Sequence, residues 1–283
     1  MERRPFQRTP SSNNLPFLNG YRFTDEKLGM GAYSVVQRAY SDKLSEYVAV
    51  KVTDELKEPG EFVKNSVPKE VTILQRLNHE HIVDIYDYFQ QGYKYFTVLA
   101  LAEAGNLDSY IKRKIRLQEK EANNLFRQIL RAVYHCHNTA KVAHGDISCT
   151  NVLLYDNNYI KLCDFGMAIE LDKSDRLLHT SYSGTHGYAA PEILDGQPYD
   201  PRFADIWALG VLLFYMVTGN FPFNISNGLE GLRSDMDNPP RWPRPLNRIS
   251  KPCRDLIKSM LTVNVEHRIH LSGIWESEWM TSY

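Results

Sequence analysis

The hydrophobic pattern changes character near Gly105, and this change constrains the fold more than any other feature of the sequence. Before it, the chain is rich in β-branched residues, with strand-like cores at Val35-Val36 and at 47–52. After it, apolar residues recur at helical spacing, as in Ala122, Leu125, Phe126, Ile129 and Val133. We therefore expect an α+β fold, with a small β-rich part followed by a larger helical part.

Two shorter patterns refine this outline. Val67, Val71 and Leu74 lie on one side of a helix within the β-rich part, with Pro68 near the expected start. In the second part, residues 152–154 and 159–163 read as strands, and the turn-forming residues 156–158 between them predict a hairpin.

Composition sets the domain limits and excludes several classes of function. Residues 1–20 are polar and rich in Pro, Ser and Asn, so we expect a disordered N-terminal extension, followed by one folded domain over 21–283. The β-rich part is expected at 21–100 and the helical part at 103–283. A net charge of -1 gives no reason to expect nucleic acid or an anionic membrane surface as a partner.

Features of localisation point inside the cell. The N-terminus has no apolar core for a signal peptide, and the apolar run 207–217 is about half as long as a bilayer requires, which favours a buried helix. The four cysteines are widely spaced and show no metal-ligand pattern. Reduced thiols in a cytoplasmic protein are the simplest interpretation.

A glycine-containing turn separates two of the expected strands, in the run Leu28-Gly29-Met30-Gly31-Ala32-Tyr33-Ser34-Val35-Val36. Glycines let backbone N–H groups approach phosphate oxygens without a Cβ in the way. Alone, two glycines are more typical of an ordinary hairpin turn, and Ser34 occupies the place of a third glycine.

Lys51 closes the apolar run Val48-Ala49-Val50, where an unpaired charge is costly. Glu70, on the helix described above, is the natural partner. The alternative is a surface lysine at a strand edge, and the apolar flanks argue against it.

Three further motifs follow in order. They are His144-Gly145-Asp146-Ile147-Ser148-Cys149-Thr150-Asn151, Asp164-Phe165-Gly166 and Ala190-Pro191-Glu192. Together with the glycine-rich turn, Lys51 and Glu70, they resemble the catalytic domain of protein kinases over residues 21 to about 280. Each short match could arise by chance, but the full ordered series could not.

The resemblance implies a two-lobed kinase fold with ATP and Mg²⁺ as cofactors. Asp146 would accept the proton of the substrate hydroxyl, Lys51 would bind the phosphates, and Asn151 and Asp164 would be the metal ligands. The residues that would bind the nucleotide are Leu28, Gly29, Gly31, Val36, Ala49, Lys51, Glu70, Leu99, Ala100, Ala102, Asn106 and Leu153.

Other segments resemble the supporting frame of the family. The run 205–210 resembles the buried helix that anchors the catalytic loop, and Arg268 is placed to pair with Glu192. The loop 184–192 is similar to the substrate loop of serine/threonine kinases. Pro68-Lys69-Glu70 and the closing segment 274–280 most resemble the testis-specific serine/threonine kinases of the calmodulin-dependent kinase group.

Two residues depart from the family pattern. Gly145 stands where most kinases have Arg, and Ser148 stands where serine/threonine kinases have Lys. Loss of one preorganised cationic donor can cost on the order of 10²–10³ in rate. An active serine/threonine kinase is therefore weighed against an ATP-binding scaffold with weak or no phosphotransfer, and against a binding module that has lost ATP.

Regulation and partners follow from the same resemblance. Ser181 aligns with the usual activation-loop phosphosite, with Thr180 beside it, so an upstream kinase is an expected partner besides protein substrates. A monomer is expected.

Substrate preference depends on positions where kinases that favour basic substrates often have acidic groups. This chain has Asn106, Thr150 and Tyr215 there, so such a preference is not expected. Cys163 should border the nucleotide pocket and is expected to be inert.

Overall fold

The computed structural model describes residues 16–31, 34–57, 60–171, 184–245 and 248–283. The chain divides into two compact units. Unit 1 comprises residues up to Val63 together with Tyr86–Leu101, and unit 2 comprises Lys64–Ile85 together with Ala102–Tyr283. The expected limits of 21–100 and 103–283 stay a prediction, since this division assigns most of the first long helix to unit 2.

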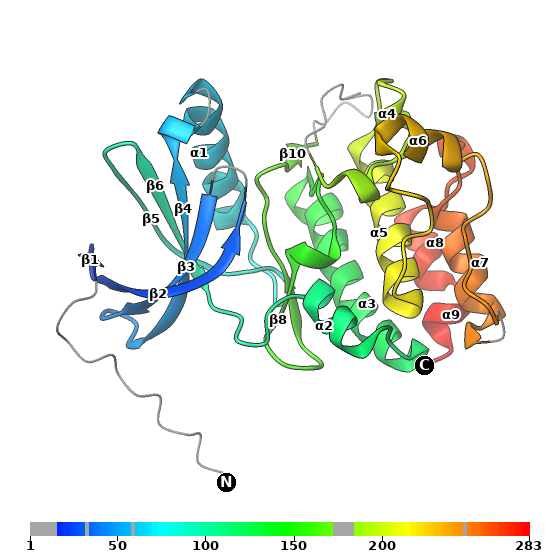
Figure 1. Cartoon of the computed structure of the whole chain (residues 1–283), viewed down its shortest axis with the longest axis horizontal. Coiled ribbons are helices and arrows are strands. Elements are labelled where there is room, and N and C mark those ends of the chain that lie inside the picture. The colour runs from blue at the N-terminus through cyan, green and yellow to red at the C-terminus, as the bar shows by residue number, and fades with distance from the viewer. Residues whose placement is uncertain (1–15, 32–33, 58–59, 172–183, 246–247) are drawn as a thin grey trace, which may run out of the picture. The chain divides into compact units, whose positions relative to one another are not determined.

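Unit 1 is built on one antiparallel sheet, with strand order β1-β2-β3-β4-β6-β5 (Figure 1). The strands are β1 (Phe17–Leu18), β2 (Tyr21–Met30), β3 (Ser34–Ser41), β4 (Glu46–Asp54), β5 (Ile85–Gln91) and β6 (Lys94–Ala100). A short 3-10 turn, Glu55–Lys57, follows β4. Residues 17–18, expected to be disordered, instead pair with β2, and residues 1–15 lie outside the described part.

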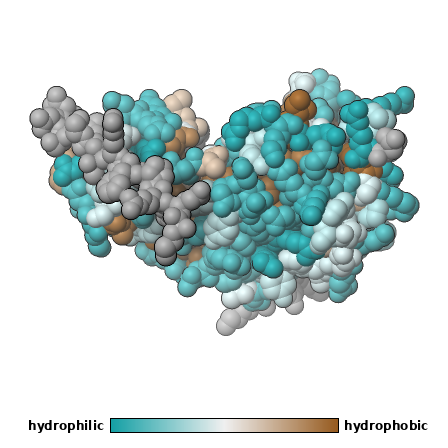
Figure 2. All heavy atoms as spheres, turned by 90° about the horizontal axis from the view of Figure 1, so that it is seen from below, coloured by the Kyte–Doolittle hydropathy of each residue, from teal (hydrophilic) through white to brown (hydrophobic). Residues whose placement is uncertain are grey.

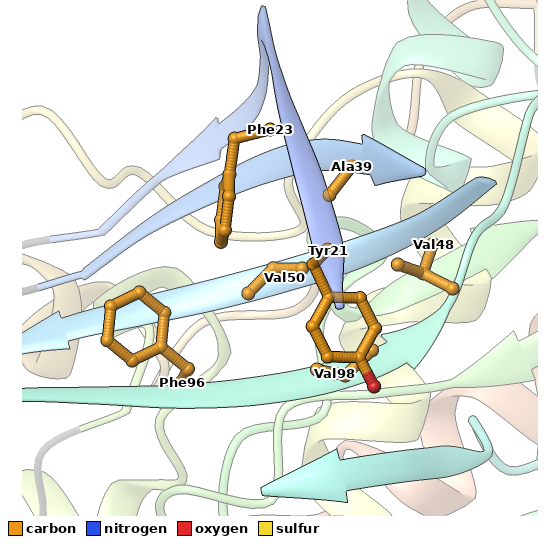
Figure 3. Packing of buried hydrophobic residues seen from close by; sticks show 7 residues of the cluster. All are labelled: Tyr21, Phe23, Ala39, Val48, Val50, Phe96 and Val98. Carbon is orange, nitrogen blue, oxygen red and sulfur yellow. The ribbon is translucent and has the colours of Figure 1, made fainter. Parts of the chain in front are cut away.

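The core of unit 1 covers one face of this sheet. Because side chains alternate between the two faces of a strand, every second residue of β3, β4 and β6 points to the same side. The buried cluster consists of Tyr21, Phe23, Ala39, Val48, Val50, Phe96 and Val98 (Figure 3). Phe96 stacks on Phe89 with ring centroids 4.8 Å apart.

Unit 2 is mainly helical. Its longer helices are α1 (Gly60–Arg76, which begins in unit 1), α2 (Leu107–Lys114), α3 (Glu119–Tyr134), α5 (Pro201–Thr218), α6 (Gly228–Asp235) and α7 (Lys251–Met260). The short helices are α4 (Pro191–Leu194), α8 (Leu271–Glu276) and α9 (Glu278–Thr281). Helix α1 starts at Gly60, so Pro68 lies inside it and not near its start, contrary to expectation.

Helix α5 forms the centre of unit 2 and packs against α3 and α7 (Figure 1). Asp200 caps its N-terminus by accepting from the backbone N–H of Arg202 at 2.9 Å. By length and composition this helix could cross a membrane, but 89% of its apolar window is buried inside the fold. The expectation of a buried helix over 207–217 is thus confirmed.

Short elements complete unit 2. They are the π-helical turn η2 (His135–Ala140), β7 (Val142–Ala143), η3 (Cys149–Asn151), β8 (Val152–Leu154), β9 (Ile160–Leu162), β10 (Ile169–Glu170), η4 (His186–Tyr188) and η6 (Val265–His267). Strands β8 and β9 form the predicted antiparallel hairpin, and β7 pairs with β10. The β-rich part followed by a helical part confirms the expected fold class.

Hydrophilic residues cover most of the face drawn in Figure 2, where hydrophobic residues form small separate patches. Among the described residues, the most exposed large hydrophobic side chains include Ile115, Met30 and Leu56, which lie on separate elements. Single exposed apolar residues of this kind are normal on a protein surface.

Candidate active site

The strand register of unit 1 places the predicted nucleotide-binding residues on one face of the sheet. Val36 lies opposite Lys51 across β3 and β4, and Ala49 lies opposite Leu99 across β4 and β6. Ala49 and Lys51 are two positions apart, so all four side chains point away from the face that carries the buried cluster. The structure therefore brings these four residues together.

The glycine-rich turn begins in the same sheet. Gly29 pairs with Val36, and the N–H of Gly31 donates to the carbonyl of Ser34 at 2.8 Å. A Cβ on Gly31 would lie 3.0 Å from the Ser34 hydroxyl oxygen, which is tighter than most side chains tolerate. Leu28 is 39% exposed, and Ala32 and Tyr33 at the tip lie outside the described residues.

Lys51 lies in unit 1 and Glu70 lies in unit 2, so their predicted ion pair stays a prediction. Glu70 is buried on α1, and its carboxylate lies close to Gly166 in the Asp164-Phe165-Gly166 segment. A Cβ on Gly166 would lie 3.6 Å from Oε2 of Glu70 and 3.3 Å from Oδ1 of Asp164. Glycine thus leaves room for both carboxylates.

The carboxylate of Asp146 is held by two N–H donors. The Asn151 side-chain amide donates to Oδ2 at 2.8 Å and to the Asp146 backbone carbonyl at 2.9 Å. The backbone N–H of Thr185 donates to Oδ1 at 2.7 Å. Since each carboxylate oxygen has two lone pairs, both oxygens keep acceptor capacity for a substrate hydroxyl.

His144 connects the catalytic loop to the segment that contains Asp164. The backbone N–H of Asp146 donates to Nδ1 of His144 at 3.2 Å, so the ring proton resides on Nε2, which donates to the carbonyl of Cys163 at 3.0 Å. The His144 ring also packs on Phe165, with centroids 4.6 Å apart. Asp164 follows with a φ of 62°, in the left-handed region.

Asp205 on α5 fixes the start of the catalytic loop. Its carboxylate accepts from the backbone N–H groups of His144 at 2.8 Å and Gly145 at 3.0 Å. Nε2 of His137 lies 2.7 Å from the same carboxylate. The sequence predicted an anchoring helix here, but it gave no sign of His137, which is separated from Asp205 by 68 positions.

Gly145 makes a close backbone contact. Its φ is +76°, and a Cβ built on it would lie 2.4 Å from the carbonyl oxygen of Met167. L-residues rarely adopt this conformation. Gly145, which stands at the position of the usual arginine, therefore also allows the loop backbone to approach Met167 closely.

Ser148 is fully buried, and its hydroxyl lies 2.8 Å from that of Thr150. The two hydroxyls bond each other. Because a hydroxyl is uncharged, neither side chain supplies the positive charge that a lysine would bring.

Asn106 and Leu153 lie together in unit 2, where they form an isolated β-bridge. The side chain of Asn106 caps α2, because its Oδ1 accepts from the N–H of Ser109 at 2.9 Å. Its amide N–H groups remain the donors that a ribose could use. Ala100 ends β6 in unit 1, and Ala102 is the first residue of the second segment of unit 2.

The predicted pair of Arg268 and Glu192 is confirmed. The guanidinium donates to both carboxylate oxygens, at 2.7 and 2.9 Å, and also to the carbonyl of Phe203 at 2.9 Å. Arg268 is 1% exposed, so the ion pair is buried and fully hydrogen-bonded. It anchors the end of the substrate loop.

The cysteines near the loop differ in accessibility. Burial raises the pKa of Cys149 to about 12, and its backbone N–H donates to the hydroxyl of Tyr188 at 3.3 Å. Burial also raises the pKa of Tyr188. Cys163 is only partly buried.

Ser181 and Thr180, the predicted phosphosites, lie outside the described residues.

The residues around Asp146 suit a bound magnesium ion. Asp164 is an exposed residue, and Asn151 donates through its amide nitrogen, which leaves its carbonyl oxygen to face a cation. Within the described ranges, no group of three or more His, Cys, Asp or Glu residues could hold a metal by itself. Mg²⁺ is commonly held by only one or two carboxylates together with substrate phosphates, so this donor set fits.

Comparisons with known proteins agree with this arrangement. The protein kinase domain model matches residues 23–280. The chain is 39% identical to mouse testis-specific serine/threonine-protein kinase 1, over 89% of this chain and 70% of the relative. It is 35% identical to human testis-specific serine/threonine-protein kinase 3, over 93% of this chain and 97% of the relative.

A further relative is the human NUAK family SNF1-like kinase 1, which is 36% identical over 90% of this chain but 38% of its own length. The predicted resemblance to the testis-specific kinases is confirmed by these matches. From the extent of the family match and the ordered motifs, the chain belongs to the protein kinase domain family.

Proposed function

We propose that this protein transfers the γ-phosphate of ATP to serine or threonine hydroxyls of protein substrates. The observation that carries the proposal is the Asp146 carboxylate, held by the Asn151 amide and the Thr185 N–H on a loop anchored by Asp205. Relatives named as serine/threonine kinases support the same chemistry.

The family resemblance and the positions of the residues support the following roles. Asp146 orients the attacking hydroxyl and accepts its proton as the oxygen attacks phosphorus. Val36, Ala49 and Leu153 are assigned to the adenine, Leu99 to the back of the nucleotide pocket, and Lys51 to the phosphates. Asp164 and Asn151 would hold Mg²⁺, which would neutralise charge on the transferring phosphoryl group.

Ser148 sets the expected rate. A lysine at this position would supply a cation to the transition state, whereas the Ser148 hydroxyl is bonded to Thr150. Loss of one such donor costs on the order of 10²–10³ in rate, so slow but measurable turnover is expected.

The rival function is a nucleotide-binding scaffold without turnover, suggested by Gly145 and Ser148. The intact set of Lys51, Asp146, Asn151 and Asp164 favours catalysis, and the names of the relatives give the scaffold no support. The test is transfer of labelled phosphate from Mg-ATP to a generic protein substrate by wild type and by Asp164→Asn. Equal labelling by the two would overturn the proposal, whereas loss in the variant supports it.

Regulation through the activation loop is proposed to be weak. Gly145 cannot bind a phosphorylated Ser181 or Thr180 as an arginine would. We therefore expect Ser181→Ala to retain most of the phosphotransfer rate, and a large drop at unchanged protein level would contradict this. A cytoplasmic monomer acting on protein substrates stays part of the proposal.

A further inference from the structure

Unit 2 contains a cavity of about 440 Å³ that the proposed chemistry does not use. It is formed by the segment after α1, the C-terminal part of α3, the turn η2 and α8. The lining residues are His79, Arg131, Tyr134, His135, Thr139 and Trp275. Its volume lies within the range of small-molecule binding sites.

The lining is cationic or neutral. Arg131 carries the permanent charge, and the rings of His79 and His135 lie 5.0 Å apart. None of the six lining residues is a carboxylate. This combination favours an anion over a cation as the ligand.

Glu80 is the acidic group that competes for Arg131. Its Oε1 lies 3.8 Å from Nη1 of Arg131 and 3.5 Å from Nε2 of His81. Both Arg131 and Glu80 are more than half exposed, and such ion pairs contribute little. A guanidinium has five N–H donors, and this contact involves Nη1 alone, so an anion can bind Arg131 beside Glu80.

His135 adds an atom that lacks a partner. Its Nε2 is shielded from solvent and has no hydrogen-bond partner within the described part of the chain. An atom that water cannot reach cannot meet a ligand in the cavity either, so His135 contributes only its ring, which packs against His79 with centroids 5.0 Å apart.

Two aromatic side chains provide the apolar surface of the cavity. Tyr134 is 47% exposed, and Trp275 is partly buried on α8. Flat apolar groups pack favourably on such rings. We infer that this cavity binds a small organic anion, namely an aromatic body that carries a phosphate, sulfonate or carboxylate.

A metal ion would be the alternative ligand for two close histidines. No group of three or more metal-binding side chains occurs in the ranges that the structure describes. The arginine beside the histidines also disfavours a cation. The organic anion is thus the better match.

His79 is held in its neutral form. The backbone N–H of His81 donates to Nδ1 of His79 at 3.1 Å, so the ring proton lies on Nε2. Burial lowers the pKa of His79, and the charges of His135, His81 and Arg131 lower it further, while Glu80 raises it. The positive charge of the site therefore comes from Arg131.

The probe for the test is 1-naphthyl phosphate, titrated into the full chain with a non-hydrolysable ATP analogue present to fill the nucleotide site. Binding is followed by isothermal calorimetry and by Trp fluorescence. The variants are Arg131→Gln and His135→Phe, and the matched control is Lys120→Gln, an exposed cation on α3 that does not line the cavity. Melting temperatures check that each variant is folded.

We expect saturable binding by wild type and by Lys120→Gln, with Kd below about 1 mM. Arg131→Gln should weaken it by about five-fold or more, because it loses the charged donor, whereas His135→Phe keeps the ring packing and should weaken it less. Neutral 1-naphthol should bind about ten-fold more weakly, because it lacks the anionic group.

No saturable binding by wild type would overturn the inference, and so would equal binding by Arg131→Gln and wild type. Equal affinity for 1-naphthol would show that no anion is selected, with the same consequence. These readouts do not involve phosphotransfer, so they remain informative if the proposed kinase activity fails.

Discussion

The predicted site residues of the two units are positioned by different means. In unit 1, strand register places Val36, Ala49, Lys51 and Leu99 on one face, opposite the buried cluster. In unit 2, Asp146 is positioned by hydrogen bonds between segments far apart in the chain, which converge on Asp205. The residues of unit 1 should therefore tolerate local substitutions. In unit 2, loss of any one of these hydrogen bonds should lower the phosphotransfer rate.

The largest effect is expected from Asp205→Ala. It leaves the buried N–H groups of His144 and Gly145 and the ring of His137 without their acceptor, which should cost about 3–5 kcal/mol of unfolding free energy. Misplacement of Asp146 should lower kcat by about 10²-fold or more. Denaturant unfolding and a phosphotransfer assay measure the two effects, and a stable variant with unchanged kcat would show that Asp205 does not position the loop.

Phe96→Ala tests the prediction for unit 1. Phe96 is buried in the core of unit 1 against Phe89 and Phe23, so its truncation should cost about 3–5 kcal/mol of stability. The core lies on the face opposite Ala49 and Lys51, so at a temperature where the variant is folded kcat should change by less than about three-fold. A drop in kcat as large as that of Asp205→Ala would show that the two units do not differ in their sensitivity to substitution.

Gly145→Ala should have an intermediate effect. The positive φ costs about 1–2 kcal/mol, and the close approach to Met167 adds about 1–3 kcal/mol. Gly196→Ala is the matched control, because Gly196 has a φ of +63° with no atom within 4 Å of the built Cβ. The difference in unfolding free energy between the two variants isolates the Met167 contact, and equal losses would mean that the contact is unimportant.

Asn106→Ala should have the smallest effect. It removes the N-cap bond to Ser109, which should cost about 1 kcal/mol, while Asn106→Ser should retain most of the cap. Thermal melts of the two variants measure the difference. If Asn106 also binds the ribose, both variants should raise the KM for ATP, and an unchanged KM would limit Asn106 to its structural role.

The same contrast explains what could be predicted from sequence. The β-branched residues along 47–52 are a local signal, so they predicted the strand that carries Ala49 and Lys51. The ordered motifs predicted the catalytic loop. The family resemblance also predicted the ion pair of Arg268 and Glu192, which the structure contains.

The missed features depend on tertiary contacts or on backbone conformation. His137 meets Asp205 only because η2 and α5 pack together, and no local pattern marks that contact. The approach of Gly145 to Met167 depends on a positive φ. Glycine permits this conformation, but its presence in the sequence does not predict it. Residues 17–18 pair with β2 despite a polar, strand-poor surrounding sequence, since tertiary context overrides local propensity.

The most direct test of the central claim is phosphotransfer by Asp146→Asn, a substitution of nearly equal size. If Asp146 is the base, kcat should fall by about 10²–10⁴-fold, while the Mg-ATP-induced rise in melting temperature stays as in wild type. Labelling of the substrate at the same rate by wild type and by Asp146→Asn would contradict the account.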